Sequence, residues 1–224
     1  MHLESLQPLT SAIGSASTPV MLVSLIGGRI VPSFTHNWMV KQDPEAATPA
    51  SFDLVDRIAL AATAVALSAW VITPEAKWTP WLQLAAGFAL AARLGRWCGE
   101  KALREPLLWV LHLGYGWLSF GLLLLGFNSL ASMLPQTTAL HALTVGVIGT
   151  RTLAVMTRAS LGHTGRALIA GPRTTTTYAL ITLATACDFS RRSSVRIIIW
   201  WRCRSPARHG VELSVYSRCS ILDR

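Results

Sequence analysis

Three histidines stand where this sequence could bind a metal. His112 lies inside an apolar run, and His141 and His163 lie at the two ends of another apolar run. An imidazole nitrogen binds heme iron, copper or zinc, so each of the three is a candidate ligand. An ordinary structural role also remains open for each. His112 suits a buried side chain bonded to nearby backbone, and His141 and His163 suit solvated positions at a helix end and in a loop.

Helical geometry limits how these histidines can combine. His141 and His163 are separated by 22 residues, which is about 30 Å at about 1.5 Å per residue of continuous helix. The two therefore cannot share one metal ion. We expect His112 and His163 on the same, cytoplasmic side of the protein, so that pair remains open. His141 needs a partner from the opposite side.

Glycine and arginine mark a second candidate site, in the stretch LVSLIGGRIVPSFTHNW. The pair Gly27 and Gly28 predicts close contact with a neighbouring helix. Pro32 lacks a backbone N–H and is expected to bend or end the helix. Arg29 suits either of two roles. It can extend to lipid phosphates at the membrane boundary, or its planar fork can hold an anionic group such as a carboxylate.

Arg151 interrupts an apolar run near its middle, about 15 Å from the start of the run along a helix axis. A guanidinium stays charged in proteins. No carboxylate occurs between Glu105 and Asp188, so a partner would have to be a distant acid such as Asp53 or Asp56. We therefore expect Arg151 to destabilise insertion of its helix by a few kcal/mol.

The composition is that of a membrane protein. The chain has 224 residues, of which 51% are hydrophobic and 14% are charged, and its mean hydropathy is +0.42. Soluble domains carry about 25% charged residues. The net charge of +9 raises nucleic acid as a partner, but the arginines lie at the ends of apolar runs and near the C-terminus. Nucleic-acid binding needs a clustered basic face, so we expect the lipid bilayer as the partner.

Five apolar runs are candidates to cross a bilayer, which takes about 20 residues of helix. They cover residues 14–34, 54–73, 78–97, 106–127 and 139–156, and a weaker sixth starts near 174 and stops at Cys187. Their apolar residues do not alternate, so helices are predicted and barrel strands are not. The predicted fold class is all-α, a polytopic transmembrane helical bundle of about five to six spans. A soluble helical protein with buried helices is the alternative.

Basic residues in the loops predict the orientation of the bundle. The loops before residue 106 and after residue 156 are basic, whereas NSLASMLPQTT between them has no charge. By the positive-inside rule the basic loops face the cytoplasm and the N-terminus faces outward. The basic loop residues are Arg93, Arg96, Lys101 and Arg104, followed by Arg158, Arg166 and Arg173.

Five tryptophans lie near the predicted span ends, as interfacial anchors do. They are Trp38, Trp78, Trp81, Trp97 and Trp109.

The adjacent Asp56 and Arg57 point to different faces of the second helix, and we interpret both as charges that flank its span.

The last part of the chain differs from the rest. Residues 187–224 carry eight arginines, no lysine and three of the four cysteines. If the sixth helix spans, this basic tail lies on the outer side, against the positive-inside rule. We interpret the tail as out of frame, with a basic interaction tail or an amphipathic surface helix around RIIIWWR as alternatives. The chain then divides into an N-terminal segment (1–13), a transmembrane region (14–186) and this tail.

Three blocks of the sequence resemble the NnrS family in the same order: LVSLIGGRIVPSFTHNW, EPLLWVLHLGYGWLSFGLLLLG and HALTVGVIGTRTLAVMTRASLGHTGR. The resemblance covers about residues 15–186, and the third block is the most specific. It implies a polytopic bacterial inner-membrane protein that is associated with heme b and copper and responds to nitric oxide, the small-molecule ligand. It also implies that His112, His141 and His163 are metal ligands and that Arg29, Arg158 and Arg166 bind the cofactor.

This chain departs from the family pattern in three ways. Family members look about twice as long, so we expect the chain to correspond to their C-terminal half. Arg151 stands where an uncharged residue, often Met, is expected. His36 stands where Arg is expected.

Three functions remain open at this point. The first is a heme- or copper-binding protein of nitric oxide stress, with other membrane subunits or a missing N-terminal half as partners. The second is half of a helical transporter or channel without metal, and the third is an inert fragment that holds no cofactor. The sequence contains no nucleophile triad, phosphate loop or Cys–His zinc pattern, so an enzyme is the less favoured interpretation.

Overall fold

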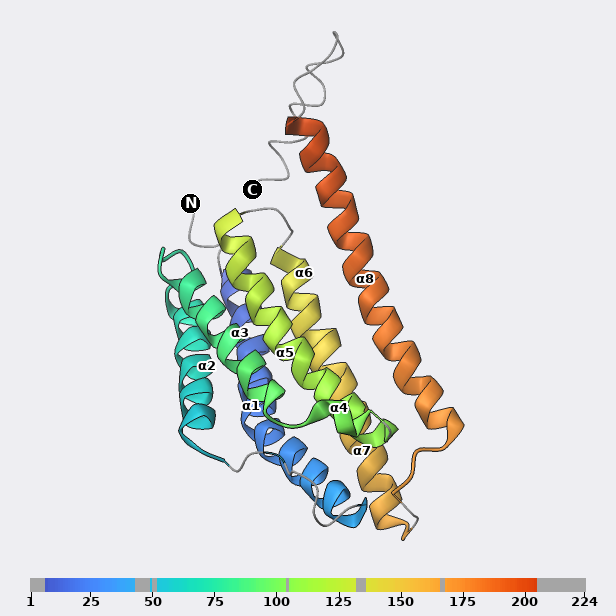
Figure 1. Cartoon of the computed structure of the whole chain (residues 1–224). Helices are drawn as coiled ribbons and strands as arrows, with labels where there is room; N and C mark the ends of the chain where they lie inside the picture. Colours follow the sequence, from blue (N-terminus) through green and yellow to red (C-terminus); the bar gives the residue numbers. More distant parts are fainter. Residues whose placement is uncertain are drawn as a thin grey trace.

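In the structure, a computed structural model, every regular element of the described residues is a helix (Figure 1), as the sequence predicts. Those residues are 7–42, 49, 52–103, 105–131, 136–165 and 168–204. The elements are α1 (Gln7–Gln42), α2 (Leu54–Ile72), α3 (Thr79–Gly95), α4 (Gly99–Ala102), α5 (Pro106–Ala131), α6 (Gln136–His141), the π-helix η1 (Ala142–Gly149), α7 (Thr150–His163) and α8 (Pro172–Arg204).

Helix α5 lies at the centre of the bundle. It packs against α3, η1, α7 and α1, while α2 packs on α3 and α1. Two glycines of α5 allow neighbouring helices to approach its backbone closely. A Cβ at Gly121 would lie 2.6 Å from Leu143 Cδ2, and a Cβ at Gly126 would lie 2.7 Å from the Pro80 carbonyl oxygen. Small residues at such contacts bring helix backbones together, which is how helices associate in a bilayer.

Four helices among the described residues are long and apolar enough to cross a membrane. They are Ser17–Gln42, Leu54–Ile72, Pro106–Ala131 and Thr138–His163, the last of which joins α6, η1 and α7. The predicted span 78–97 forms α3, whose 17 residues give about 25 Å of helix, less than the roughly 30 Å of a hydrocarbon core. Large apolar side chains such as Ile72, Phe88 and Met156 are exposed on the outside of the bundle. The protein is therefore a membrane protein with lipid-facing helices.

Several helices run beyond their predicted ends, and α1 and α8 show why. Helix α1 contains both Pro19 and Pro32 and continues to Gln42, so Pro32 does not end it. Neighbouring helices make an interior proline tolerable in a membrane helix, because they and local adjustments satisfy the freed backbone groups. Helix α8 passes Cys187, where the sixth apolar run stops, and continues to Arg204.

The last of the four spans is not a regular α-helix. Its residues Ala142–Gly149 form a π-helix between two α-helical segments. Gly146 faces Trp117 there, since a Cβ on Gly146 would lie 2.9 Å from Trp117 Cδ2. π-Helical turns are rare and are frequent at functional sites. This one directly precedes Thr150 and Arg151.

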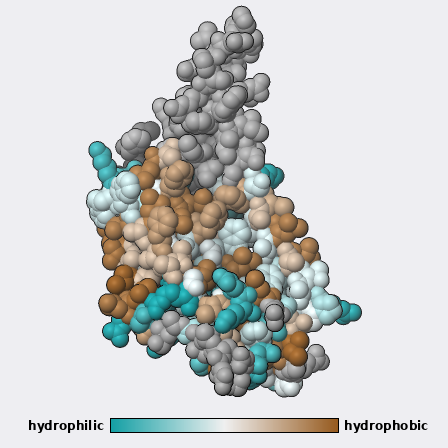
Figure 2. Space-filling model, in the orientation of Figure 1, coloured by the Kyte–Doolittle hydropathy of each residue, from teal (hydrophilic) through white to brown (hydrophobic). Residues whose placement is uncertain are grey.

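The basic loops lie at one end of the bundle, the lower end in Figure 1. At this basic end α1, α3 and α7 end and α2, α5 and α8 begin. In Figure 2 hydrophilic side chains gather mostly toward this end, and hydrophobic ones cover the middle and upper part of the same face. The arrangement agrees with the predicted alternation of basic and uncharged loops.

The tryptophans divide between surface and interior. Trp78 and Trp81 are exposed, as anchors should be. The prediction that Trp97 is an interfacial anchor is wrong, because Trp97 is 1% exposed and the centre of its ring lies 4.6 Å from that of Tyr115. It fills the interior where α3 turns toward α5.

Candidate functional site

Two arginines lie inside the bundle, and the first, Arg93, has a partner for each guanidinium nitrogen. Arg93 is 0% exposed. Its Nε donates to Asp56 Oδ1 at 2.5 Å, its Nη1 to the Tyr115 hydroxyl at 3.0 Å and its Nη2 to the Gly28 carbonyl at 3.1 Å. The interpretation of Asp56 as a flank charge and of Arg93 as a loop residue was therefore wrong. The pair joins α2 to α3 within the bundle.

The second buried arginine, Arg151, is only partly paired. It is 6% exposed, and its Nη1 donates to the Val23 carbonyl at 3.1 Å. Its guanidinium carbon lies 5.2 Å from the centre of the Tyr115 ring. Its Nε and Nη2 have no hydrogen-bond partner, and no acid among the described residues forms an ion pair with it. A buried charge with unpaired N–H groups is costly. The effect of Arg151 on the insertion of its helix into the membrane stays a prediction.

Three glycines make the space that these arginine side chains occupy. A Cβ at Gly27 would lie 1.4 Å from Arg151 Nη1, one at Gly28 would lie 2.3 Å from Arg93 Nη1, and one at Gly114 would lie 2.7 Å from Arg151 Cγ. The sequence predicted close contact with a neighbouring helix at Gly27 and Gly28. The structure places two arginine side chains against this pair, Arg151 from α7 and Arg93 from α3.

His112 is buried in α5 and keeps one ring nitrogen free. It is 8% exposed and meets Trp97 edge-on, with ring centres 6.4 Å apart. Its Nδ1 lies 3.0 Å from the Leu108 carbonyl. A carbonyl only accepts, so Nδ1 carries the proton and Nε2 bears the lone pair. Nε2 is buried without a hydrogen bond of regular geometry, and the Trp97 backbone is a second backbone group that interacts with the ring. His112 thus combines the backbone bond of a structural histidine with a ring nitrogen of the kind that binds a metal.

The other two histidines lie far from each other. His141 is half-buried at the end of α6, and His163 is exposed at the end of α7. They stand at opposite ends of one span, as predicted. Within the part of the chain that the structure describes, no three His, Cys, Asp or Glu side chains could hold one metal ion. The three predicted ligands therefore do not form one cluster.

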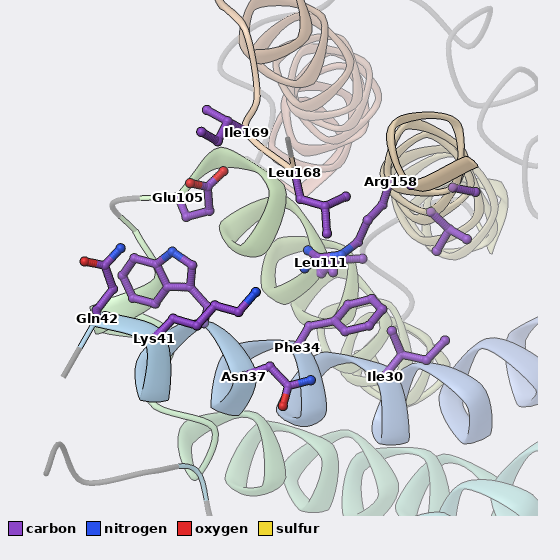
Figure 3. Close-up of a pocket in the computed structure, with 14 residues that line it drawn as sticks. Ile30, Phe34, Asn37, Lys41, Gln42, Glu105, Leu111, Arg158, Leu168 and Ile169 are labelled. Carbon is purple, nitrogen blue, oxygen red and sulfur yellow. The ribbon is translucent and has the colours of Figure 1, made fainter. Parts of the chain in front are cut away.

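A cavity of about 760 Å³ opens at the basic end between α1, α5 and α7. Figure 3 shows Lys41 and Arg158 reaching into it from opposite sides, from α1 and α7. The guanidinium carbon of Arg158 lies 4.0 Å from the centre of the Phe34 ring, a distance that fits a cation–π contact. Glu105 adds one carboxylate to the lining. The polar part of this cavity thus offers two cations and one anion.

A second cavity, of about 210 Å³, continues the first toward the middle of the bundle. The two share Ile30, Leu111 and Val155 in their linings. The second is almost entirely apolar apart from Arg151 and Thr152. We call the two together the α1–α7 groove.

The three arginines predicted to bind a cofactor lie in different places. Arg158 lines the α1–α7 groove. Arg29 is exposed on α1 and is not part of the lining. Arg166 lies outside the described residues.

Sequence reasoning missed Asp56, Arg93, Tyr115 and Glu105 as interior or cavity residues. One signal could have marked Asp56. Three small residues follow it at helical spacing, and all three are 0% exposed in the structure: Ala59, Thr63 and Ala66. A carboxylate on the same face as such a run points inward. Arg93, two residues from the end of α3, gives no comparable signal.

Asp53 and Arg96 form an ion pair at the surface of the basic end. Asp53 caps α2, and its Oδ1 accepts hydrogen bonds from the Val55 N–H and from Arg96 Nη1, each at 2.9 Å. A second contact joins Arg96 Nη2 and Asp53 Oδ2. The hydrogen bond from Arg96 lowers the pKa of the Asp53 carboxyl well below its usual range. The same pair raises the pKa of the Arg96 guanidinium.

One protein family matches the chain over most of its length. A family model described as "NnrS protein" matches residues 4–191. No curated protein and no solved structure matches the chain. The match does not bear out the expectation that the chain corresponds to the C-terminal half of family members. The blocks that carry the resemblance, with His112 and Arg158 in them, all lie within the matched residues, and the chain belongs to the NnrS family.

Proposed function

We propose that this protein is an inner-membrane protein that binds heme b and copper and acts in the response to nitric oxide. Membership of the NnrS family and four helices able to span a membrane support this proposal. One observation carries the metal-binding part. His112 holds a buried Nε2 that makes no hydrogen bond of regular geometry, while its Nδ1 is fixed by the Leu108 carbonyl. This is the arrangement that orients an imidazole toward a metal.

His112 is the ligand that this proposal rests on, and the roles of His141 and His163 as ligands stay predictions. A neutral imidazole suits iron or copper. However, none of the three predicted histidine ligands lines the α1–α7 groove, and these residues contain no cluster of three or more metal-binding side chains. A porphyrin in the groove would therefore not meet His112. The geometry of His112 supports only the binding part of the proposal, and nitric oxide and other membrane subunits enter it through the family alone.

Metal content of the purified full-length protein tests the proposal. Heme is measured by its Soret band and copper by elemental analysis. We expect His112→Ala to lose bound heme or copper and His36→Ala to retain it, because His36 is exposed on α1. Equal metal content in the two variants would remove His112 as a ligand.

Two alternative outcomes distinguish the other functions. Solute flux through vesicles that contain the protein, without any Soret band, would indicate a transporter or channel half. Failure to insert or rapid degradation in cells would indicate an inert fragment.

A further inference from the structure

We propose that the α1–α7 groove binds one glycerophospholipid whose head group carries a hydrogen-bond donor. The phosphate lies between Arg158 and Lys41, the donor meets Glu105, and part of an acyl chain follows the apolar extension of the groove. The site does not include His112. The inference therefore stands apart from metal binding.

The phosphate end is set by two cations on opposite walls. Arg158 and Lys41 both line the larger cavity, and their side chains converge in Figure 3. Stacking on Phe34 holds the Arg158 guanidinium in place, and its Nη1 has no hydrogen-bond partner. Guanidinium and ammonium groups donate strong, charge-assisted hydrogen bonds to phosphate. Basic pockets between membrane helices on the cytoplasmic side are known to hold lipid head groups.

Glu105 specifies the head group further. It lines the same cavity as Arg158, yet no ion pair joins the two side chains. Its Oε1 is also without a hydrogen-bond partner. Glu105 acts on Arg158 by charge without a direct contact, so Oε1 and Nη1 each still lack a hydrogen-bond partner. A ligand that brings both a phosphate and a donor satisfies both side chains, as phosphoethanolamine and phosphoglycerol do. Phosphocholine has no N–H or O–H donor and leaves Glu105 unsatisfied.

The apolar extension accounts for the rest of the lipid. Arg151 stands seven residues before Arg158, so the groove runs about 10 Å deeper along α7. Leu22, Ile26 and Met156 line this part and are 59%, 43% and 63% exposed. A free phosphate or sugar phosphate would leave these side chains uncovered. A lipid covers them and keeps its head at the basic end, where the cytoplasmic leaflet is expected.

Lipid retention tests this site. The full-length protein is purified in detergent, and bound lipid is counted by native mass spectrometry. Phosphatidylethanolamine, phosphatidylglycerol and phosphatidylcholine with identical acyl chains are added separately. We expect the first two lipids to be retained several-fold more than phosphatidylcholine. Arg158→Gln should lower retention of all three about tenfold, whereas Arg173→Gln, an exposed arginine at the same end, should leave it unchanged.

Two further measurements assign the roles of the side chains. Glu105→Leu, which removes the acceptor, should abolish the preference over phosphatidylcholine while phosphate binding persists. Val155→Trp, at the junction of the two cavities, should lower retention of every lipid. Thermal unfolding confirms that each variant is folded, and Arg158→Lys, which keeps the charge, should restore part of the retention if Arg158→Gln is unstable.

Several outcomes would overturn the proposal. One is equal retention of phosphatidylcholine and phosphatidylethanolamine by the unaltered protein. Another is full displacement of bound lipid by free glycerol phosphate, which would mean that the apolar extension contributes nothing. Loss of the Soret band without loss of lipid in Arg158→Gln would assign the cavity to heme. Appearance of a dimer whose interface excludes lipid from the groove would assign it to a second copy of the chain.

Discussion

A Cβ atom on Gly27 would lie 1.4 Å from Nη1 of Arg151, so the guanidinium occupies the space that any side chain at position 27 would need. Gly114 bounds the same arginine from α5, where a Cβ would lie 2.7 Å from its Cγ. A charged side chain near the middle of a span thus fits between two helices because both carry glycine there. This relationship yields the first prediction.

Gly27→Ala should destabilise the folded protein by about 1–3 kcal/mol, the usual cost of forcing an extra group into a packed interior. The measurement is thermal or denaturant unfolding in detergent. Gly14→Ala on the same helix is the matched control, because a Cβ there meets nothing within 4 Å. Arg151→Ala should relieve the clash, so the double variant Gly27→Ala/Arg151→Ala should lose less than the sum of the two single changes. Equal stability of Gly27→Ala and Gly14→Ala would contradict the packing.

Arg151→Met should increase the fraction of the last span that inserts into membranes. An arginine near mid-membrane costs about 2.5–3.5 kcal/mol on the insertion scale, and the Val23 carbonyl and the Tyr115 ring are available to it only after the bundle has assembled. Glycosylation mapping measures insertion, and immunoblotting measures the steady-state level. If neither changes, water or another protein accommodates the charge, and a functional role for Arg151 becomes the better explanation.

Asp56→Asn should cost about 3–5 kcal/mol of stability, because it leaves Arg93 as an uncompensated buried charge. Arg57→Gln, at the exposed neighbouring position, is the control and should change little. A variant that removes both charges, Asp56→Leu/Arg93→Met, should recover most of the loss, since an apolar pair avoids the desolvation of the ions. A double variant as unstable as Asp56→Asn would show that hydrogen bonds to Tyr115 and Gly28 matter more than the charge.

The Asp53–Arg96 pair should make stability fall in acid. Folding lowers the pKa of Asp53, so the ionised carboxylate stabilises the folded protein at pH values above its unfolded pKa of about 3.9. This contribution is lost as the pH falls below that value toward the lower folded pKa. The unfolding temperature of the unaltered protein should therefore fall more than that of Asp53→Asn between about pH 5 and about pH 3. Parallel curves would show that the pair does not stabilise the folded state.

The two ends of α5 should lie on opposite sides of the membrane. A reporter fused after Leu103 should report the cytoplasm, and one fused after Ala131 should report the outer side. The basic residues Arg96 and Lys101 near the first site and the uncharged loop after the second motivate this expectation. Two reporters on one side would contradict a spanning α5.

The membrane class, the helical fold and the family all follow from the amino-acid sequence read alone. Apolar runs of span length determine helices in lipid, because every backbone N–H and C=O must be satisfied within its own segment. Four of the five predicted spans coincide with span-capable helices, and their ends differ from prediction most where α1 continues to Gln42 and the last span continues to His163. Helix propensity and hydropathy change only gradually along the chain, so they predict the ends of helices poorly.

Which polar residues face inward was decided only by the tertiary structure. Asp56 and Arg93 are 37 positions apart in sequence, and Arg151 meets Gly27 across more than a hundred residues, so no local pattern links them. Burial of an ion pair depends on which helix face meets which neighbour, and that is set by packing among all the helices together. The same reason explains His112 and Arg158. Their residue types marked both as candidates, and helix packing alone put a free Nε2 in the interior and a guanidinium over Phe34 in a cavity.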